Sequence, residues 1–167
     1  RVAWLRITYE GFAPMIDDAY RFAKWNRFDT VDNRVGVPPD GSPRMFINDL
    51  GIFLYDGDNV PDLAALAGKV KGTIREQEVV EYEAYMLRDE EYCAWVSNVM
   101  AAAAKPWFVF VMPESETTAF VEKQLDPLLN REEGGVAFFV QPYPRRLAQS
   151  SAFPLPRTED EWLCVVG

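Results

Sequence analysis

The stretch Val2-Ala3-Trp4-Leu5-Arg6-Ile7-Thr8-Tyr9 is rich in β-branched and aromatic residues and predicts a strand. Gly11 ends this stretch, and Pro14 suits the first turn of a helix, where its missing N–H costs nothing. Apolar residues then recur at the spacing of one helical face, namely Ile16, Ala19, Tyr20 and Ala23. Since the chain must return to the sheet after a helix, residues 29–37 are expected to form a second strand, parallel and adjacent to the first.

Turn residues organise the next part of the chain. Pro39-Asp40-Gly41-Ser42-Pro43 is followed by two short apolar segments, residues 44–47 and 51–55, whose spacing predicts a tight hairpin around Asn48-Asp49-Leu50. The turn Asp56-Gly57-Asp58-Asn59 should precede a short helix that Gly72 ends. This turn lacks the distal glutamate of a calcium loop, so we expect it to have a capping role.

The second half predicts helices. Thr73-Ile74-Arg75-Glu76 has the pattern of a capping box, and residues 73–104 contain neither glycine nor proline. A further helix is expected over residues 115–130 and a strand over 136–140. The predicted fold is α+β, with an α/β N-terminal half. A thioredoxin-like βαβ–ββα unit spans residues 1–72, a mainly helical half spans residues 73–135, and a proline-rich tail, irregular after its strand, spans residues 136–167.

Composition excludes several classes of protein. The 167 residues include 26 acidic and 17 basic side chains and no histidine, which gives a net charge of −9. Histidine-based catalysis and metal binding are therefore excluded, and the acidic balance argues against binding nucleic acid. No apolar run is long enough to form a transmembrane segment. Cys93 and Cys164 belong to no CxxC unit; they are expected to be buried thiols in a reducing compartment, although a long-range disulfide is an alternative.

The order of predicted elements resembles the glutathione-transferase fold. Residues 39–46 look like the proline turn that precedes the third strand of that family, and residues 54–60 look like its strand-to-helix turn. Within the superfamily, the segment Glu78-Val79-Val80-Glu81-Tyr82-Glu83-Ala84-Tyr85-Met86 is similar to the start of the helical module in metaxins, which are non-catalytic subunits of the mitochondrial import machinery. The resemblance covers roughly residues 3 to 104.

This resemblance implies that the protein has a transferase-like fold but no transferase activity. An active transferase stabilises a glutathione thiolate with a hydroxyl or thiol after its first strand, where only Tyr9 is available here. It also holds the γ-glutamyl group with an acid followed by serine, whereas this chain has Asp56 followed by glycine. We therefore expect no catalytic residues, cofactor or metal, with Tyr9 and Asp56 as the catalytic and ligand-binding alternatives.

The acidic clusters at residues 17–18, 89–91 and 159–161 are interpreted as a helix-dipole pair and solvated faces. Large aromatic residues near prolines are the candidate anchors for a partner protein: Trp107, Phe108, Phe110, Tyr143, Phe153 and Trp162.

The sequence thus predicts a metaxin-like, non-catalytic scaffold or assembly subunit that binds other protein subunits. Its expected location is mitochondrial, or otherwise cytoplasmic. The two alternatives are a glutathione-dependent transferase that uses Tyr9 and an acidic inhibitor or immunity protein that masks a basic partner.

Overall fold

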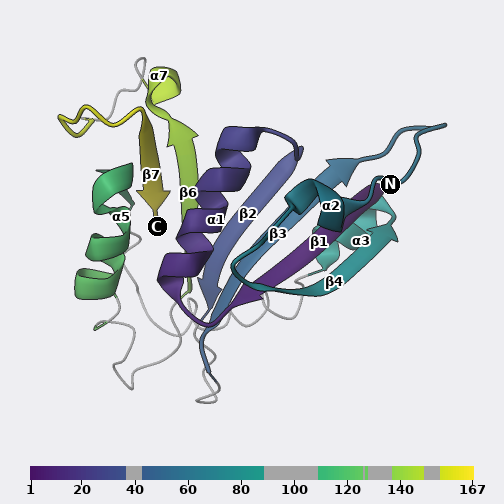
Figure 1. Ribbon diagram of the computed structural model, residues 1–167, viewed down its shortest axis with the longest axis horizontal. Helices are drawn as coiled ribbons and strands as arrows, with labels where there is room; N and C mark the ends of the chain where they lie inside the picture. The colour runs from purple at the N-terminus through teal and green to yellow at the C-terminus, as the bar shows by residue number, and fades with distance from the viewer. Residues whose placement is uncertain (37–42, 89–108, 126, 128–136, 149–154) are drawn as a thin grey trace.

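Strand β1, Val2–Tyr9, lies between two other strands of the sheet, and its side chains are buried on both faces. The computed structural model describes residues 1–36, 43–88, 109–125, 127, 137–148 and 155–167 (Figure 1). Leu5 and Ile7 of β1 belong to the main core beneath helix α1, whereas Trp4 packs with Tyr85 on the other side of the sheet. We call the side covered by α1 the helix face and the other side the opposite face.

The first half of the chain forms a split βαβ unit. Its elements follow the order β1-α1-β2-β3-α2-β4, and its strands lie side by side in the order β4-β1-β3-β2. All neighbouring strands are antiparallel, which is the topology of ferredoxin-like folds. The remaining elements of this unit are α1 (Phe12–Trp25), β2 (Thr30–Gly36), β3 (Met45–Phe53), α2 (Leu63–Ala67) and β4 (Thr73–Val80).

The second half extends the same sheet beyond β2 in the order β6-β7-β5. Its elements are α3 (Tyr82–Leu87), β5 (Phe110–Pro113), α5 (Glu114–Phe120), the π-helical turn η1 (Val121–Leu125), β6 (Ala137–Pro144), α7 (Arg145–Ala148) and β7 (Trp162–Val166). Figure 1 shows α5 beside the β7 end of the sheet, away from β4. Within the described ranges, no helix is long and apolar enough to cross a membrane.

The predicted fold class is wrong, because the protein has a seven-stranded antiparallel sheet in place of a thioredoxin-like unit followed by a helical module. The strand predicted at residues 29–37 is β2, and it runs parallel to β1, but β3 lies between the two. The predicted hairpin at residues 44–55 is one continuous strand, β3. Asn48 and Asp49 were interpreted as turn residues, yet each is buried in the strand and bonded to other side chains.

Of the helical stretch predicted over residues 73–104, the first part is strand β4, residues 82–87 form helix α3, and residues 89–104 lie outside the described part of the chain. Seven registered pairs join β4 to β1, and this long-range pairing outweighs the local capping-box pattern. The strand predicted at residues 136–140 is confirmed as β6, and the tail predicted to be irregular after it contributes β7, so strands from all three predicted segments share one sheet. Helix α1 begins at Phe12, which places Asp17 and Asp18 beyond its first turn and removes the helix-dipole explanation for them.

Candidate functional site

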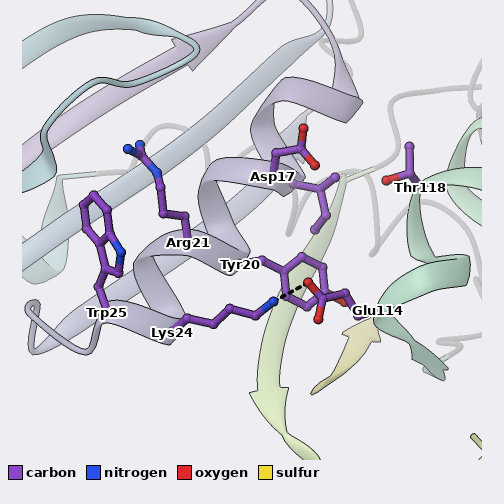
Figure 2. A pocket seen from close by; sticks show the side chains of 8 residues that line it. Asp17, Tyr20, Arg21, Lys24, Trp25, Glu114 and Thr118 are labelled. Carbon is purple, nitrogen blue, oxygen red and sulfur yellow. Dashed lines mark hydrogen bonds and ion pairs between the residues drawn. The ribbon is translucent and has the colours of Figure 1, made fainter. Parts of the chain in front are cut away.

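A groove runs between α1 and α5 (Figure 2). It consists of a cavity of about 290 Å³ and a second of about 420 Å³, and both are lined by Lys24 and Glu114. Lys24 Nζ lies 2.5 Å from Glu114 Oε1 and bridges the two helices. We call this the α1–α5 groove, and its lining residues are Ile16, Asp17, Tyr20, Arg21, Lys24, Trp25, Glu114, Ser115, Thr118, Asp160, Glu161 and Trp162.

The Lys24 ammonium group is held between aromatic rings and a carboxylate. Its Nζ lies 5.4 Å from the centre of the Tyr20 ring and 5.9 Å from that of Trp162. Tyr20 and Lys24 are four residues apart on α1, so their side chains meet on one helical face, whereas Trp162 comes from β7. Rings at such distances attract a cation. The groove therefore contains a cation site that the chain fills with its own lysine.

The lining of the groove is acidic, since its four carboxylates outnumber its two basic side chains. Asp17 Oδ2 accepts a hydrogen bond from Lys71 Nζ at 2.5 Å. Asp160 Oδ2 accepts one from the backbone N–H of Ser115 at 2.8 Å, and this bond lowers the pKa of Asp160. These carboxylates are partly exposed, so they attract cations to a groove that stays open to solvent.

The polar groups beneath the groove are buried and hydrogen-bonded to one another. The hydroxyls of Tyr20 and Thr117 are hydrogen-bonded at 3.1 Å, and Thr117 Oγ1 donates to Pro113 O. Burial raises the pKa of Tyr20 and raises that of the free thiol of Cys164 to about 12. A nucleophilic thiol or phenol needs its pKa lowered, so the raised values oppose a nucleophilic role for Tyr20 and Cys164.

The structure places the predicted partner anchors in separate surroundings. Trp162 lines the α1–α5 groove. Phe110, on β5, is 39% exposed and packs against Phe120 with 5.2 Å between ring centres. Tyr143 is half-buried on β6, and burial raises its pKa. Trp107, Phe108 and Phe153 lie outside the described residues.

Tyr9 and Asp56 lie far apart. The Tyr9 hydroxyl is buried; it donates to Asp18 and accepts from Asn48, and burial followed by the Asp18 charge raises its pKa. Tyr9 pairs with Phe46 at the start of β3, whereas Asp56 follows the end of that strand. Seven residues of strand separate those two ends, or about 23 Å. The two side chains are therefore too far apart to contact one glutathione molecule.

A charged cluster on the opposite face was not predicted from the sequence. The carboxylate of Asp49 is fully buried and accepts two hydrogen bonds of 2.9 Å from Arg6 and one of 2.8 Å from Arg34. Arg88 lies 3.4 Å from Asp49 and 3.3 Å from Asp32. These groups come from three strands and from the residue after α3, so no local spacing indicated them. Their mutual bonding gives them a structural role.

The groove also joins residues that are distant in sequence, since Lys24 and Glu114 are 90 positions apart. Asp160 belongs to the acidic run at residues 159–161, which is interpreted from the sequence as a solvated face. In the structure it lies just before β7 and accepts a hydrogen bond from Ser115 of α5. Comparison of the sequence with protein-family models and with curated proteins found no match.

Proposed function

We propose that the protein is a non-catalytic binding or assembly subunit that docks a basic segment of another protein in the α1–α5 groove. The observation that carries this proposal is the Lys24 ammonium group, which is held by Tyr20, Trp162 and Glu114. A lysine or arginine of a partner would find the same two rings and the same carboxylate. Trp162 was a predicted anchor, and its position in the groove supports that role.

Charge supports a basic partner. The groove lining carries two more acidic than basic side chains, and the whole chain has a net charge of −9. Complementary charge steers a partner toward its site and excludes acidic competitors. The Lys24–Glu114 pair is partly exposed, at 40% and 33% of the two side chains, and such pairs contribute only about 0–1 kcal/mol. Displacing Lys24 also costs its contacts with the Tyr20 and Trp162 rings, about 0.5–1 kcal/mol each, and a partner cation in the same position regains both contacts and the ion pair.

A binding role is also supported by the state of the candidate reactive groups. The pKa values of Tyr9, Tyr20 and Cys164 are all raised, which keeps these groups protonated at neutral pH. The transferase alternative needs Tyr9 and Asp56 together, and they lie at opposite ends of β3. The metaxin resemblance and the mitochondrial location stay predictions from sequence, and the order of elements on which they rest is replaced by an antiparallel sheet.

The proposal can be tested by titration calorimetry with a short peptide in which lysine alternates with glycine. A peptide with glutamate at the lysine positions is the matched control. We expect the lysine peptide to bind and the glutamate peptide not to bind. Glu114→Gln should weaken binding, because the groove then loses the carboxylate that faces the cation position.

Lys24→Met gives the sharper result. It removes the competing ammonium group, so the lysine peptide should bind about two- to fivefold more tightly. Lys123→Met removes the same charge from an exposed position outside the groove lining and should change affinity much less. Weaker binding by Lys24→Met, or equal effects of the two variants, would refute the proposal.

The alternative of an acidic inhibitor differs in its response to salt. If the whole −9 charge masks a basic partner, affinity should fall steeply as ionic strength rises. Docking through the aromatic rings of the groove should retain most of its affinity, because short contacts are screened less than long-range attraction.

A further inference from the structure

The Lys24 ammonium group divides the α1–α5 groove into its two cavities. Tyr20 lines the smaller cavity and Trp162 lines the larger one. Of the described lining residues, Lys24 and Glu114 alone are shared, so the bond between Lys24 Nζ and Glu114 Oε1 lies between the cavities (Figure 2). Within the described part of the chain, two aromatic rings and one carboxylate therefore face the nitrogen.

The two rings are farther from this nitrogen than an N–H group needs for contact. Lys24 Nζ lies 5.4 Å from the centre of the Tyr20 ring and 5.9 Å from that of Trp162. A methyl carbon is bonded about 1.5 Å from nitrogen and packs on ring carbons at about 3.5–4.0 Å. A nitrogen whose methyl group points at a ring therefore lies about 5–5.5 Å from the ring centre. The two distances thus suit a methylated nitrogen.

Both rings are held in place by the fold. Tyr20 is only 6% exposed, and its hydroxyl is hydrogen-bonded to that of Thr117 at 3.1 Å. Trp162 is half-buried on β7 and packs against the main core. Because these contacts prevent the rings from closing on a smaller cation, the spacing is a fixed property of the site. A cation that fills it binds without an entropic cost for ordering the rings.

The number of groups around the nitrogen selects one methylation state. A tetrahedral lysine nitrogen has three substituents besides its own side chain. A dimethylammonium group has two methyl groups for the two rings and one N–H for the Glu114 carboxylate. A monomethyl group leaves one ring without a methyl contact, and a trimethyl group has no N–H to donate. Every form keeps its positive charge, so the acidic lining attracts all of them alike.

Methylation also gives a partner an advantage over Lys24. Lys24 belongs to the same chain as the site, so it competes with an effective concentration on the order of millimolar. An unmethylated lysine of a partner offers the rings and the carboxylate the same ammonium group, and it gains nothing over Lys24 in these contacts. A dimethylated lysine adds two methyl contacts that Lys24 lacks.

The geometry points to a dimethylated lysine of the partner protein as the ligand of the α1–α5 groove. This inference rests on the proposed function and names the chemical group that the groove selects. The dimethylammonium group displaces the Lys24 ammonium group, its methyl groups contact Tyr20 and Trp162, and its N–H donates to the Glu114 carboxylate. Lys24 is then an internal competitor that disfavours unmethylated segments.

Titration calorimetry with the lysine–glycine peptide tests this selection. The peptide is used in four forms, in which every lysine carries zero, one, two or three methyl groups, so that the charge at neutral pH is constant. The dimethyl form should bind about tenfold more tightly than the unmethylated form, because two methyl groups are buried, and it should also exceed the trimethyl form. Equal affinity for all four forms, or tightest binding of another form, would overturn the inference and leave the proposed function standing. Failure of every form to bind would refute the proposed function itself.

Glu114→Leu tests whether the carboxylate distinguishes two methyl groups from three. Without this acceptor the N–H has no advantage, so the trimethyl form should bind at least as tightly as the dimethyl form. The ratio of the two affinities within one variant cancels any general effect on the groove or on Lys24. Glu116→Leu removes the same charge from an exposed position of α5 outside the described lining, and it should keep the dimethyl preference. An unchanged ratio in Glu114→Leu would contradict the inference.

Discussion

Replacing Asp49 with asparagine removes a charge at the centre of the cluster on the opposite face. The Asp49 side chain is fully buried, and the side chains of Arg6 and Arg34 are only 15% and 11% exposed. Three hydrogen bonds of 2.8–2.9 Å end on its two oxygens. An asparagine of nearly the same shape directs an NH₂ group at a guanidinium, so one acceptor becomes a donor and the arginines lose their buried counter-charge, keeping only the more exposed carboxylates of Asp32 and Glu76.

Breaking a buried ion pair by removing one partner costs about 3–5 kcal/mol. We expect Asp49→Asn to lower the free energy of unfolding by this amount. With a slope of about 2 kcal/mol per molar urea, the midpoint of unfolding falls by about 1.5–2.5 M. The matched control is Asp17→Asn, since the Asp17–Lys71 pair is more than half exposed and should contribute no more than about 1 kcal/mol. A loss below 1 kcal/mol for Asp49→Asn would show that the cluster is not a coupled buried network.

Two further predictions concern the core. Burial raises the pKa of the Cys164 thiol from 9.0 to about 12. The free energy of unfolding should therefore be unaffected by this thiol below pH 9 and should decline as pH rises from about 9 to about 12. Peptide mapping should also find that iodoacetamide labels Cys164 at pH 8 only after the protein has been unfolded. Rapid labelling of the folded protein would contradict this burial. Gly72→Ala should cost about 1–3 kcal/mol in urea unfolding, because the added Cβ would lie 2.5 Å from the backbone oxygen of Thr8 and 2.7 Å from the Tyr9 ring. Gly11→Ala meets no atom within 4 Å and should cost less; equal effects would contradict the steric argument.

Local periodicity predicted individual elements better than their pairing. The strand at residues 2–9 is confirmed as β1, and the apolar stripe of the following helix is confirmed by burial of Ile16, Ala19 and Tyr20 in α1. These elements carry their pattern within a few residues. The topology was missed because Asn48 and Asp49, residue types typical of turns, are held inside β3 by partners on other strands.

Strand β4 and the groove both depend on contacts between residues that are distant in sequence, which local patterns do not predict. Thr73 to Glu76 has a helix-start pattern, yet pairing with β1 decides the conformation. Trp162 was expected to be an anchor from its residue type alone. Its neighbours in the groove, Lys24 and Glu114, become neighbours only through the completed sheet. Residue type thus made Trp162 a candidate, and only the tertiary structure shows which side chains lie beside it.

The junction between β2 and β6 has a consequence for how the chain folds. Its paired residues, such as Arg34 and Phe139, are separated by roughly 100 positions, and closing a loop of that length costs about 4 kcal/mol more than a contact between adjacent residues. The first four strands can pair earlier, and until β6 arrives β2 is an open edge like β4. A growing sheet with two open edges is exposed to strand exchange with other unfinished chains. Refolding yield should therefore fall as protein concentration rises, and a chaperone that shields β2 until β6 docks should restore it.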